Sequence, residues 1–211
     1  MTTKIKATTV FNDWAQNGKD EGMKKNHFSS YIHIKEIITK EFKNKKNIVL
    51  ADIGCGNGWA TEDLFKEKFI TSAHGYDGAS NMIKKAKLKK QGPSFFHLNL
   101  NDWKPDHKFD IIYSMEVLYY LKNPEDFIKN CYQKWLKPGG LFIAGIDHYK
   151  ENLPSLSWEK DLNVTMKTKA IGDWKKTLIN NKFKNVKALQ VNQKKEWSGT
   201  LIFYGTKNES V

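Results

Sequence analysis

The chain contains no arginine. All 35 of its basic residues are lysines, and with 23 acids they leave a formal net charge of +12. Arginine carries the planar group that reads guanine edges and clamps phosphates and carboxylates, so its absence argues against specific nucleic-acid binding. The lysines are spread from Lys4 to Lys207, which predicts at most a diffuse attraction to nucleic acid. An acidic ligand would have to be held by lysine, histidine, tyrosine or backbone amides.

The sequence also has few cysteines, and it has neither a long apolar run nor an N-terminal segment that resembles a leader. The two cysteines, Cys55 and Cys131, have the spacing of neither a zinc site nor a disulfide framework. No apolar stretch approaches the roughly 20 residues that a membrane-spanning helix needs, and the first ten residues lack the apolar segment of a signal peptide. We therefore expect a cytoplasmic protein with no bound metal and no membrane contact, as a monomer or a homodimer.

The most informative segment is 48–61, with the sequence IVLADIGCGNGWAT. An apolar run carries an acid near its end and is followed by three glycines at alternate positions, which predicts a strand, a glycine turn and a helix start against which a ligand can lie on bare backbone. The dinucleotide fingerprint needs a further glycine where this chain has Trp59, so a nicotinamide or flavin dinucleotide is disfavoured. The residues of interest are Asp52, Gly54, Cys55, Gly56 and Gly58.

Further apolar runs downstream also end in polar residues. Residues 72–77 end at Asp77, which would point into the same crevice as the glycine turn if the two strands are neighbours in a doubly wound sheet. A third run, 95–100, leads into Asp102 and Trp103. For this pair the alternative is a surface loop with a buried tryptophan.

Two more segments complete the pattern: FDIIYSMEVLYYL at 109–121 and LKPGGLFIAGID at 136–147. Together with ADIGCGNG at 51–58 they resemble the core of the class I S-adenosylmethionine (SAM) dependent methyltransferases over about residues 48–147. The resemblance implies a Rossmann-like, doubly wound α/β fold with seven strands, mostly parallel, and an antiparallel last strand. It also implies SAM as cofactor and S-adenosylhomocysteine as product.

The resemblance further implies roles for individual residues. The acid and the glycine turn at 52–58 would cradle the methionine part and the ribose, and Asp77 would accept the ribose hydroxyls. Asp102 would accept the adenine amine while Trp103 packs on the ring. Met115 and Trp14 are also predicted to contact the cofactor.

Outside the core, two amphipathic helices are predicted within residues 9–42, separated by the polar stretch 17–26. In small-molecule members of the family such a segment closes over the site, so Trp14 and His27 are pocket candidates. The alternatives are helix packing for Trp14 and a surface position for His27. We expect a single domain over 1–211: a helical cap at 1–46, a SAM-binding core at 47–147, and a substrate-side loop with a final strand pair at 148–211.

Methyl transfer needs alignment and, for a protonated acceptor, a base. His148, in the predicted loop after 136–147, is favoured because the pKa of histidine suits neutral pH. Glu116 is the second candidate, and Tyr119 or Tyr120 would orient the acceptor. The alternatives are a hydrogen-bonded loop histidine, a glutamate that contacts the cofactor or caps a helix, and a tyrosine in the core.

The sequence leaves the acceptor open among several classes. The exit of the fourth run, SMEV at 114–117, lacks the signatures of nucleic-acid amino methylation and of cytosine-5 enzymes, and the glutamate pair of protein arginine methyltransferases is also missing. We therefore expect a small-molecule acceptor, methylated at nitrogen, with oxygen or sulfur as further options. An RNA or ribosomal-protein methyltransferase and a non-catalytic SAM-binding module are the alternatives.

Overall fold

The computed structural model describes residues 3–88 and 92–209. Seven strands form one sheet in the order β3-β2-β1-β4-β5-β7-β6, in which β7 is antiparallel to both neighbours and the other pairs are parallel. The predicted fold class is therefore confirmed. The strands are β1 (Ile48–Ile53), β2 (Ile70–Asp77), β3 (Ser94–His97), β4 (Phe109–Met115), β5 (Leu136–Ile146), β6 (Lys184–Val191) and β7 (Thr200–Thr206).

The central strands form because short apolar runs place alternate side chains on opposite faces of the sheet. On β1, Leu50 packs into the core on one face, while Ala51 and Ile53 pack into the core on the other. Ile111 and Ile112 of β4 divide in the same way. Because both faces are covered, these strands read as continuous apolar runs.

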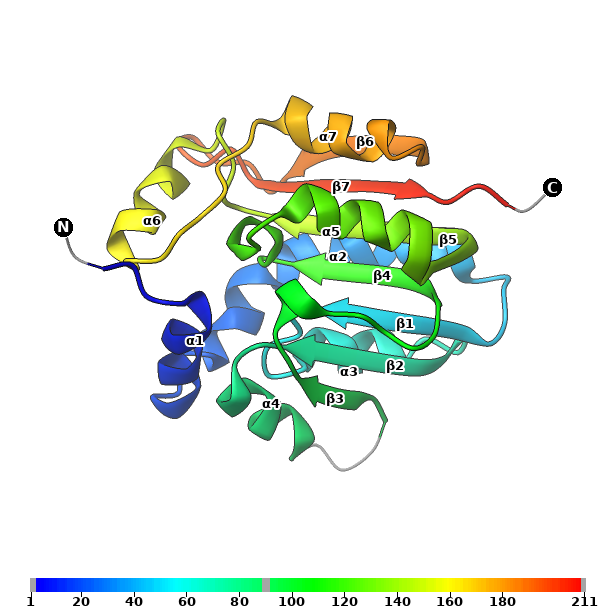
Figure 1. The fold of residues 1–211 in the computed structure, drawn as a ribbon, viewed down its shortest axis with the longest axis horizontal. Coiled ribbons are helices and arrows are strands. Elements are labelled where there is room, and N and C mark those ends of the chain that lie inside the picture. Colours follow the sequence, from blue (N-terminus) through cyan, green and yellow to red (C-terminus); the bar gives the residue numbers. More distant parts are fainter. Residues whose placement is uncertain (1–2, 89–91, 210–211) are drawn as a thin grey trace.

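Helices form a layer on each side of the sheet (Figure 1). Helices α5 (Pro124–Asn130) and α7 (Ile171–Asn180) cover one face, and α2 (Glu21–Phe42) and α3 (Trp59–Phe65) cover the other. Trp174 of α7 stacks on Phe203 of β7 with ring centroids 5.1 Å apart, and Ile34 and Ile38 of α2 are fully buried. Among residues 3–88 and 92–209, no helix combines the length and apolar character needed to cross a membrane.

The N-terminal helices are tied to the far end of the sheet. Helix α1 (Ala7–Gln16) lies beside α4 (Ser80–Lys87), beyond the tips of β1 and β2 (Figure 1), and Asn12 accepts a hydrogen bond of 2.8 Å from the backbone of Asn81 in the first turn of α4. Asp20, just before α2, pairs with Lys85 at 2.6 Å. Helix α2 starts at Glu21, inside the stretch expected to be a linker, because an acid in the first turn favours helix initiation there.

The sheet creates a natural ligand site where its connections change direction. In the sheet, β2 and β3 lie on one side of β1, and β4 and β5 lie on the other side. Connections therefore leave in opposite directions at the carboxyl ends of β1 and β4, and open α/β sheets bind ligands at that crevice. Helices α1 and α6 (Trp158–Asp161) lie beyond the same edge in Figure 1.

Candidate functional site

A cavity of about 1270 Å³ opens at the carboxyl edge of the parallel strands. Its walls come from α1, the start of α2, the ends of β1, β2, β4 and β5, the α6 region, and the start of β7. Because β7 is antiparallel, its first residue, Thr200, lies at the edge where the parallel strands end. Of the predicted site residues, those that line the cavity are Trp14, Asp52, Gly54, Cys55, Gly56, Asp77, Met115, Glu116 and Tyr119.

The glycine end of the cavity consists of Asp52, Gly54, Gly56 and Asp77. Gly54 has a φ of +77°, and a Cβ there would lie 1.9 Å from Cγ2 of Val117, so only glycine fits. Asp77 accepts hydrogen bonds from the backbone N–H of Gly56 at 2.9 Å and of Ala79 at 2.7 Å. The carboxylate thus holds the glycine turn in place and still has lone pairs directed at a ligand.

Asp52 is an almost fully buried acid below this turn. Burial raises its pKa to about 7, and the neighbouring Asp77 adds to the rise, while a 2.6 Å hydrogen bond from the Thr61 hydroxyl acts in the opposite direction. A positively charged ligand group in the cavity would favour the ionised form.

Three residues predicted to contact the cofactor lie outside the cavity wall. A Cβ on Gly58 would meet the ring of Phe95, so this glycine serves close packing of the turn. Asp102 is exposed and accepts a 2.6 Å hydrogen bond from Asn99. Trp103 is in the core, 4.6 Å from Trp135 between ring centroids, because β3 is followed by a turn that directs the large ring inward.

The wall near this turn is instead formed by neighbours that the sequence analysis did not select. Asn99, Leu100 and Asn101 line the cavity, together with Gly78 and Met82. Asn99 and Asn101 could have been selected from the sequence as wall residues, because they are polar residues that come shortly after β3.

His148 does not reach the cavity, which corrects its assignment as the favoured base. Its side chain is fully buried, with Nδ1 2.9 Å from the Ser155 carbonyl oxygen and Nε2 2.8 Å from the Thr168 hydroxyl. Burial also lowers the pKa of this imidazole. Both ring nitrogens are engaged in holding the loop after β5, as in the alternative interpretation.

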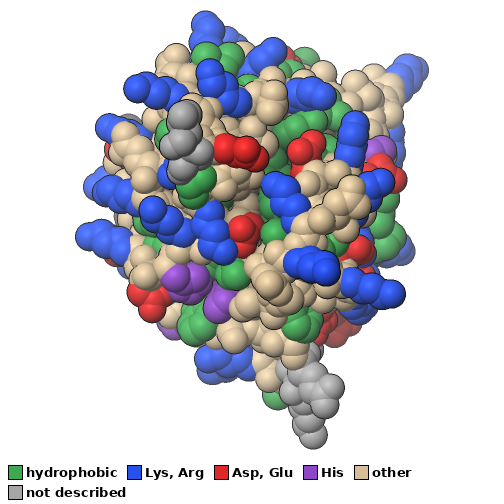
Figure 2. Space-filling model, turned by 90° about the vertical axis from the view of Figure 1, so that its right-hand side faces the viewer, with side chains coloured by type: hydrophobic (Ala, Val, Ile, Leu, Met, Phe, Trp, Pro, Cys, Tyr) green, Lys and Arg blue, Asp and Glu red, His purple; other side chains and the backbone are tan. Residues whose placement is uncertain are grey.

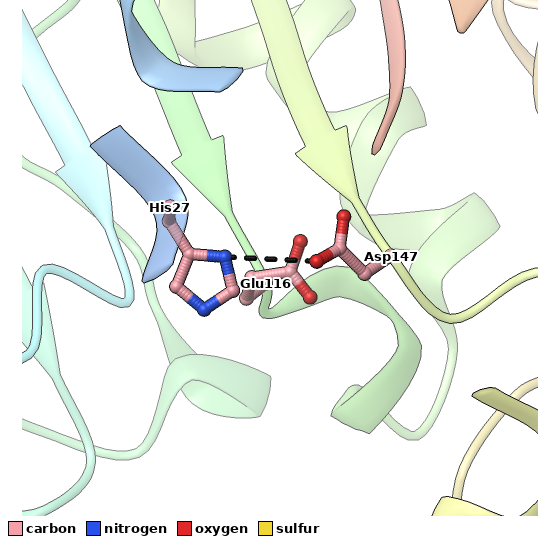
Figure 3. A group of neighbouring side chains, drawn as sticks. All are labelled: His27, Glu116 and Asp147. Atoms are coloured by element: carbon pink, nitrogen blue, oxygen red, sulfur yellow. Dashed lines mark ion pairs between the residues drawn. The ribbon is translucent and has the colours of Figure 1, made fainter. Parts of the chain in front are cut away.

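The acidic end of the cavity consists of Glu116, Asp147 and His27, which converge from the exits of β4 and β5 and from α2 (Figure 3). Glu116 has a φ of +59°, and its backbone N–H donates to the Gly145 carbonyl at 2.9 Å. The Nδ1 atom of His27 lies 3.6 Å from Oδ2 of Asp147. His27, a pocket candidate from sequence, is thus a wall residue.

Burial dominates the electrostatics of the acidic end. It raises the pKa of Glu116 well above its usual range, helped by the charge of Asp147 and opposed by hydrogen bonds from Tyr119 and the Asp147 backbone. It raises the pKa of Asp147, opposed by Thr200 and His27, and it lowers the pKa of His27, opposed by Asp147. Two acids therefore lie together in a place that disfavours their charge.

Aromatic side chains surround the acidic end. Tyr119 donates a 2.8 Å hydrogen bond to Oε2 of Glu116, and Tyr119 and Tyr120 have ring centroids 4.4 Å apart. Phe11 makes edge contacts with Trp14 at 5.3 Å and with Tyr120 at 5.5 Å. This wall offers apolar and π surface to a ligand next to the acids.

Comparison with known proteins identifies a methyltransferase domain in the chain. Residues 51–144 match the family model described as a methyltransferase domain. This segment resembles the class I SAM-dependent methyltransferases, as the sequence motifs predicted. The matched segment covers the second half of β1, all of β2, β3 and β4 and most of β5, and it contains the glycine end and Glu116.

Similar proteins differ in the acceptor that their names state. The chain is 31% identical to the ubiquinone biosynthesis O-methyltransferase of Pelagibacter ubique over 152 residues, 64% of this chain and 59% of the relative. It is 34% identical to phosphoethanolamine N-methyltransferase 1 of Zea mays over 111 residues, 48% of this chain and 22% of the relative. The chain thus spans less than two thirds of either relative.

Solved structures support the fold over nearly the whole chain. A methyltransferase of Haloferax volcanii, solved in complex with a methyltransferase activator, superposes with a TM-score of 0.79 at 22% identity and covers 94% of this chain and 98% of its own. The magnesium protoporphyrin IX methyltransferase of Synechocystis with bound S-adenosylhomocysteine gives a TM-score of 0.71 at 15% identity, covering 95% and 99%. The structural likeness thus includes the helices and strands outside 51–144.

Proposed function

We propose that this protein transfers the methyl group of SAM to a small-molecule acceptor. One observation carries the proposal: a single cavity connects the glycine end, which suits a ribose-bearing ligand, with the acidic end, which suits a second ligand. The methyl carbon would lie between the two ends, near Met115 and Tyr119, which both line the cavity.

The chain's own residues supply binding and alignment for this reaction. A lone pair of the acceptor attacks the methyl carbon, the carbon–sulfur bond breaks, and the sulfur leaves as a neutral thioether. The bare backbone at Gly54 and Gly56 would allow close approach of the cofactor, and Asp77 would accept its ribose hydroxyls. The helices α1 and α2 over the cavity would exclude water, which favours an in-line displacement.

Nitrogen is the first prediction for the acceptor atom. Carboxylates beside aromatic rings suit an amine that arrives as a cation, and Glu116, Tyr119 and Tyr120 provide such a surface. The ionised Glu116 carboxylate would take the proton of this amine before the nitrogen lone pair attacks the methyl carbon. Oxygen is the second candidate, and the relative named as an O-methyltransferase supports it. With His148 outside the cavity, Glu116 is the residue that we expect to contact the acceptor.

A small acceptor is favoured over RNA by the distribution of charge and aromatic surface. Figure 2 shows lysines scattered over the face at the amino ends of the parallel strands, which is the side away from the cavity. The lysines that line the cavity are Lys4, Lys6, Lys19 and Lys194, beside rings that include Phe11, Trp14, Trp158 and Trp197. An RNA enzyme would be expected to gather its basic side chains around the mouth.

The test is incubation with isotopically labelled SAM and, in parallel, a metabolite extract or total RNA. We expect label in a compound of low molecular mass, identified by mass spectrometry, and none in RNA. Gly54→Val is the control for cofactor-dependent labelling. Label in RNA alone would reverse the ranking, and no label with any acceptor in an enzyme that binds SAM would favour a non-catalytic module.

A further inference from the structure

The acidic end of the cavity has the composition of a metal site. His27, Glu116 and Asp147 each offer one ligand atom, and these atoms lie within 4.8 Å of one another. They come from α2 and from the ends of β4 and β5, and Figure 3 shows the imidazole and both carboxylates converging on one point. Ligand atoms that are each about 2.0–2.2 Å from one divalent cation lie at most about 4.4 Å apart, so these side chains would move slightly closer together around a bound ion.

Each of the three side chains has one polar atom that the surrounding protein leaves without a hydrogen bond. Oε2 of Glu116 accepts from Tyr119, whereas the buried Oε1 has no partner. Oδ1 of Asp147 accepts from the Thr200 hydroxyl at 2.6 Å, whereas Oδ2 faces His27 at 3.6 Å, which is too long for a hydrogen bond. Nδ1 of His27 is buried and has no partner. Unsatisfied polar atoms are rare in protein interiors, so two buried ones, His27 Nδ1 and Glu116 Oε1, beside the loosely paired Oδ2 of Asp147 indicate a ligand.

The carboxylates of Asp147 and Glu116 accept hydrogen bonds from neighbouring side chains, as ligating carboxylates in metal sites do. The hydroxyl of Thr200 lies 2.6 Å from that of Ser30, which in turn accepts a 3.0 Å hydrogen bond from the side-chain amide of Asn192. This chain orients Asp147 from one side, and Tyr119 orients Glu116 from the other. Hydrogen bonds of this kind hold ligating side chains in position.

A cation would also resolve the electrostatic conflict at this point. Two acids lie together where burial disfavours their ionised forms, and His27 is disfavoured as a cation. The chain has no arginine with which to bind an acidic or oxygen-rich acceptor, and a divalent cation can supply that charge. The sequence predicted no metal because the two cysteines lack the spacing of a metal site, and the three residues proposed here are far apart along the chain.

We propose that His27, Glu116 and Asp147 bind one divalent cation, which holds an oxygen-bearing group of the acceptor. With the cation bound, the oxygen acceptor takes precedence over a cationic amine. One imidazole and two carboxylates suit ions that accept mixed nitrogen and oxygen ligands, such as Mn²⁺. Three protein ligands leave further coordination positions open toward the cavity, and a hydroxyl, carboxylate or phosphate oxygen can occupy them. The role in acceptor binding rests on the proposed methyl transfer, whereas binding of the ion itself does not.

The test is titration of the metal-free protein with Mn²⁺ alone, followed by electron paramagnetic resonance. We expect one ion per chain and a nitrogen coupling from His27 in the pulsed spectrum. His27→Ala should remove that coupling and weaken binding at least tenfold, as should Glu116→Gln and Asp147→Asn. His33→Gln is the matched control, because His33 is on the same helix and 3.8 Å from Glu36, with its side chain 43% exposed and outside the cavity wall.

A second variant tests the partners behind the site without removing a ligand. Thr200→Val keeps the side-chain shape but deletes the hydroxyl that orients Asp147, so Mn²⁺ affinity should fall by about 10–100-fold. Affinity for S-adenosylhomocysteine and the thermal midpoint report whether each variant is folded. The nitrogen coupling in the wild-type protein tests whether a histidine binds the ion even if a variant unfolds.

The proposal is overturned if no stoichiometric Mn²⁺ binding occurs up to on the order of 1 mM, the range of weak protein sites. It is equally overturned if binding has no nitrogen coupling or survives all three ligand substitutions. In either case the three groups share protons instead of a metal. Methyl transfer that continues in the metal-free protein would leave the proposed function intact, and Mn²⁺ binding without any methyl transfer would leave the cation site intact.

Discussion

The two ends of the cavity are built in different ways. The glycine end uses backbone amides and two acids from β1, β2 and the turn between β1 and α3, all within residues 52–77. The acidic end uses side chains from α2, β4 and β5, separated by 120 positions between His27 and Asp147. A ligand site made of neighbouring segments is visible as a motif, whereas one made of distant segments exists only after the sheet has formed.

The two ends also differ in how well their polar atoms are satisfied. Both oxygens of Asp77 accept backbone hydrogen bonds, and Asp52 accepts one from Thr61. At the acidic end, Oε1 of Glu116 and Nδ1 of His27 are buried without a partner. The glycine end is therefore prepared by the fold itself, while the acidic end depends on a ligand to complete it.

Replacing Gly54 should have the largest effect on the glycine end. Gly54→Val places a side chain on Val117 and forces an unfavourable φ, which together cost up to about 6 kcal/mol of unfolding free energy. We expect calorimetry to detect no SAM binding. Gly172→Ala, where nothing lies within 4 Å of the added carbon, should bind SAM normally and be slightly more stable. SAM binding by a stable Gly54→Val protein would contradict the assignment.

The effects of substitution on the methyl-transfer rate can be compared between Glu116, at the acidic end, and His148, in the loop after β5. Glu116→Gln should slow methyl transfer by about 10²-fold or more, because it misplaces the acceptor, with little change in SAM affinity. His148→Gln should lower the thermal midpoint, since its hydrogen bonds to Ser155 and Thr168 are altered, but leave the rate of the folded enzyme nearly unchanged. Single-turnover rates of both variants check this. A larger rate loss in His148→Gln would restore the sequence-based choice.

Asp52 makes stability depend on pH in the ligand-free protein. Its pKa is about 7 when folded and near 3.8 when unfolded, so the folded state binds the proton more tightly and stability falls as pH rises from about 4 to above 7. This difference corresponds to at most about 4 kcal/mol of unfolding free energy. Asp52→Asn should be more stable than the wild type by up to this amount at about pH 8, and should have no such advantage at about pH 4.

Urea unfolding at the two pH values measures the effect. Asp106→Asn is the control, because Asp106 is exposed and next to His107, and it should gain no such stability at alkaline pH. Equal stability of Asp52→Asn and the wild type at both pH values would mean that Asp52 titrates normally.

The smallest expected effect distinguishes two acids that were both predicted to bind the cofactor. Asp77→Ala should weaken SAM binding by about 2–3 kcal/mol, because hydrogen bonds to a charged acceptor and the support of the turn are lost. Asp102→Ala should bind SAM as the wild type does, since Asp102 is exposed and outside the cavity. Calorimetry on both variants is sufficient. Equal losses would return Asp102 to the site.

The sheet and the glycine end could be predicted from the order of the residues alone. The apolar runs of β1, β2, β4 and β5 are continuous because both faces of the sheet are covered, and Gly54 is identifiable because only glycine tolerates its backbone conformation and the close contact with Val117. The acid at the end of β2 follows from the same logic, since parallel neighbours bring their carboxyl ends to one edge. These features depend on local chemistry and on a topology with few alternatives.

The direction in which individual polar and aromatic side chains point could not be predicted from the sequence, because it depends on the folded structure. Trp103 turned into the core and His148 into its loop, although both follow strands as site residues do. His27 and Asp147 became neighbours because α2 packs across the sheet and places its first turns above β5. Such contacts join segments that share no periodicity or spacing, and they arise from the packing of helices against a completed sheet.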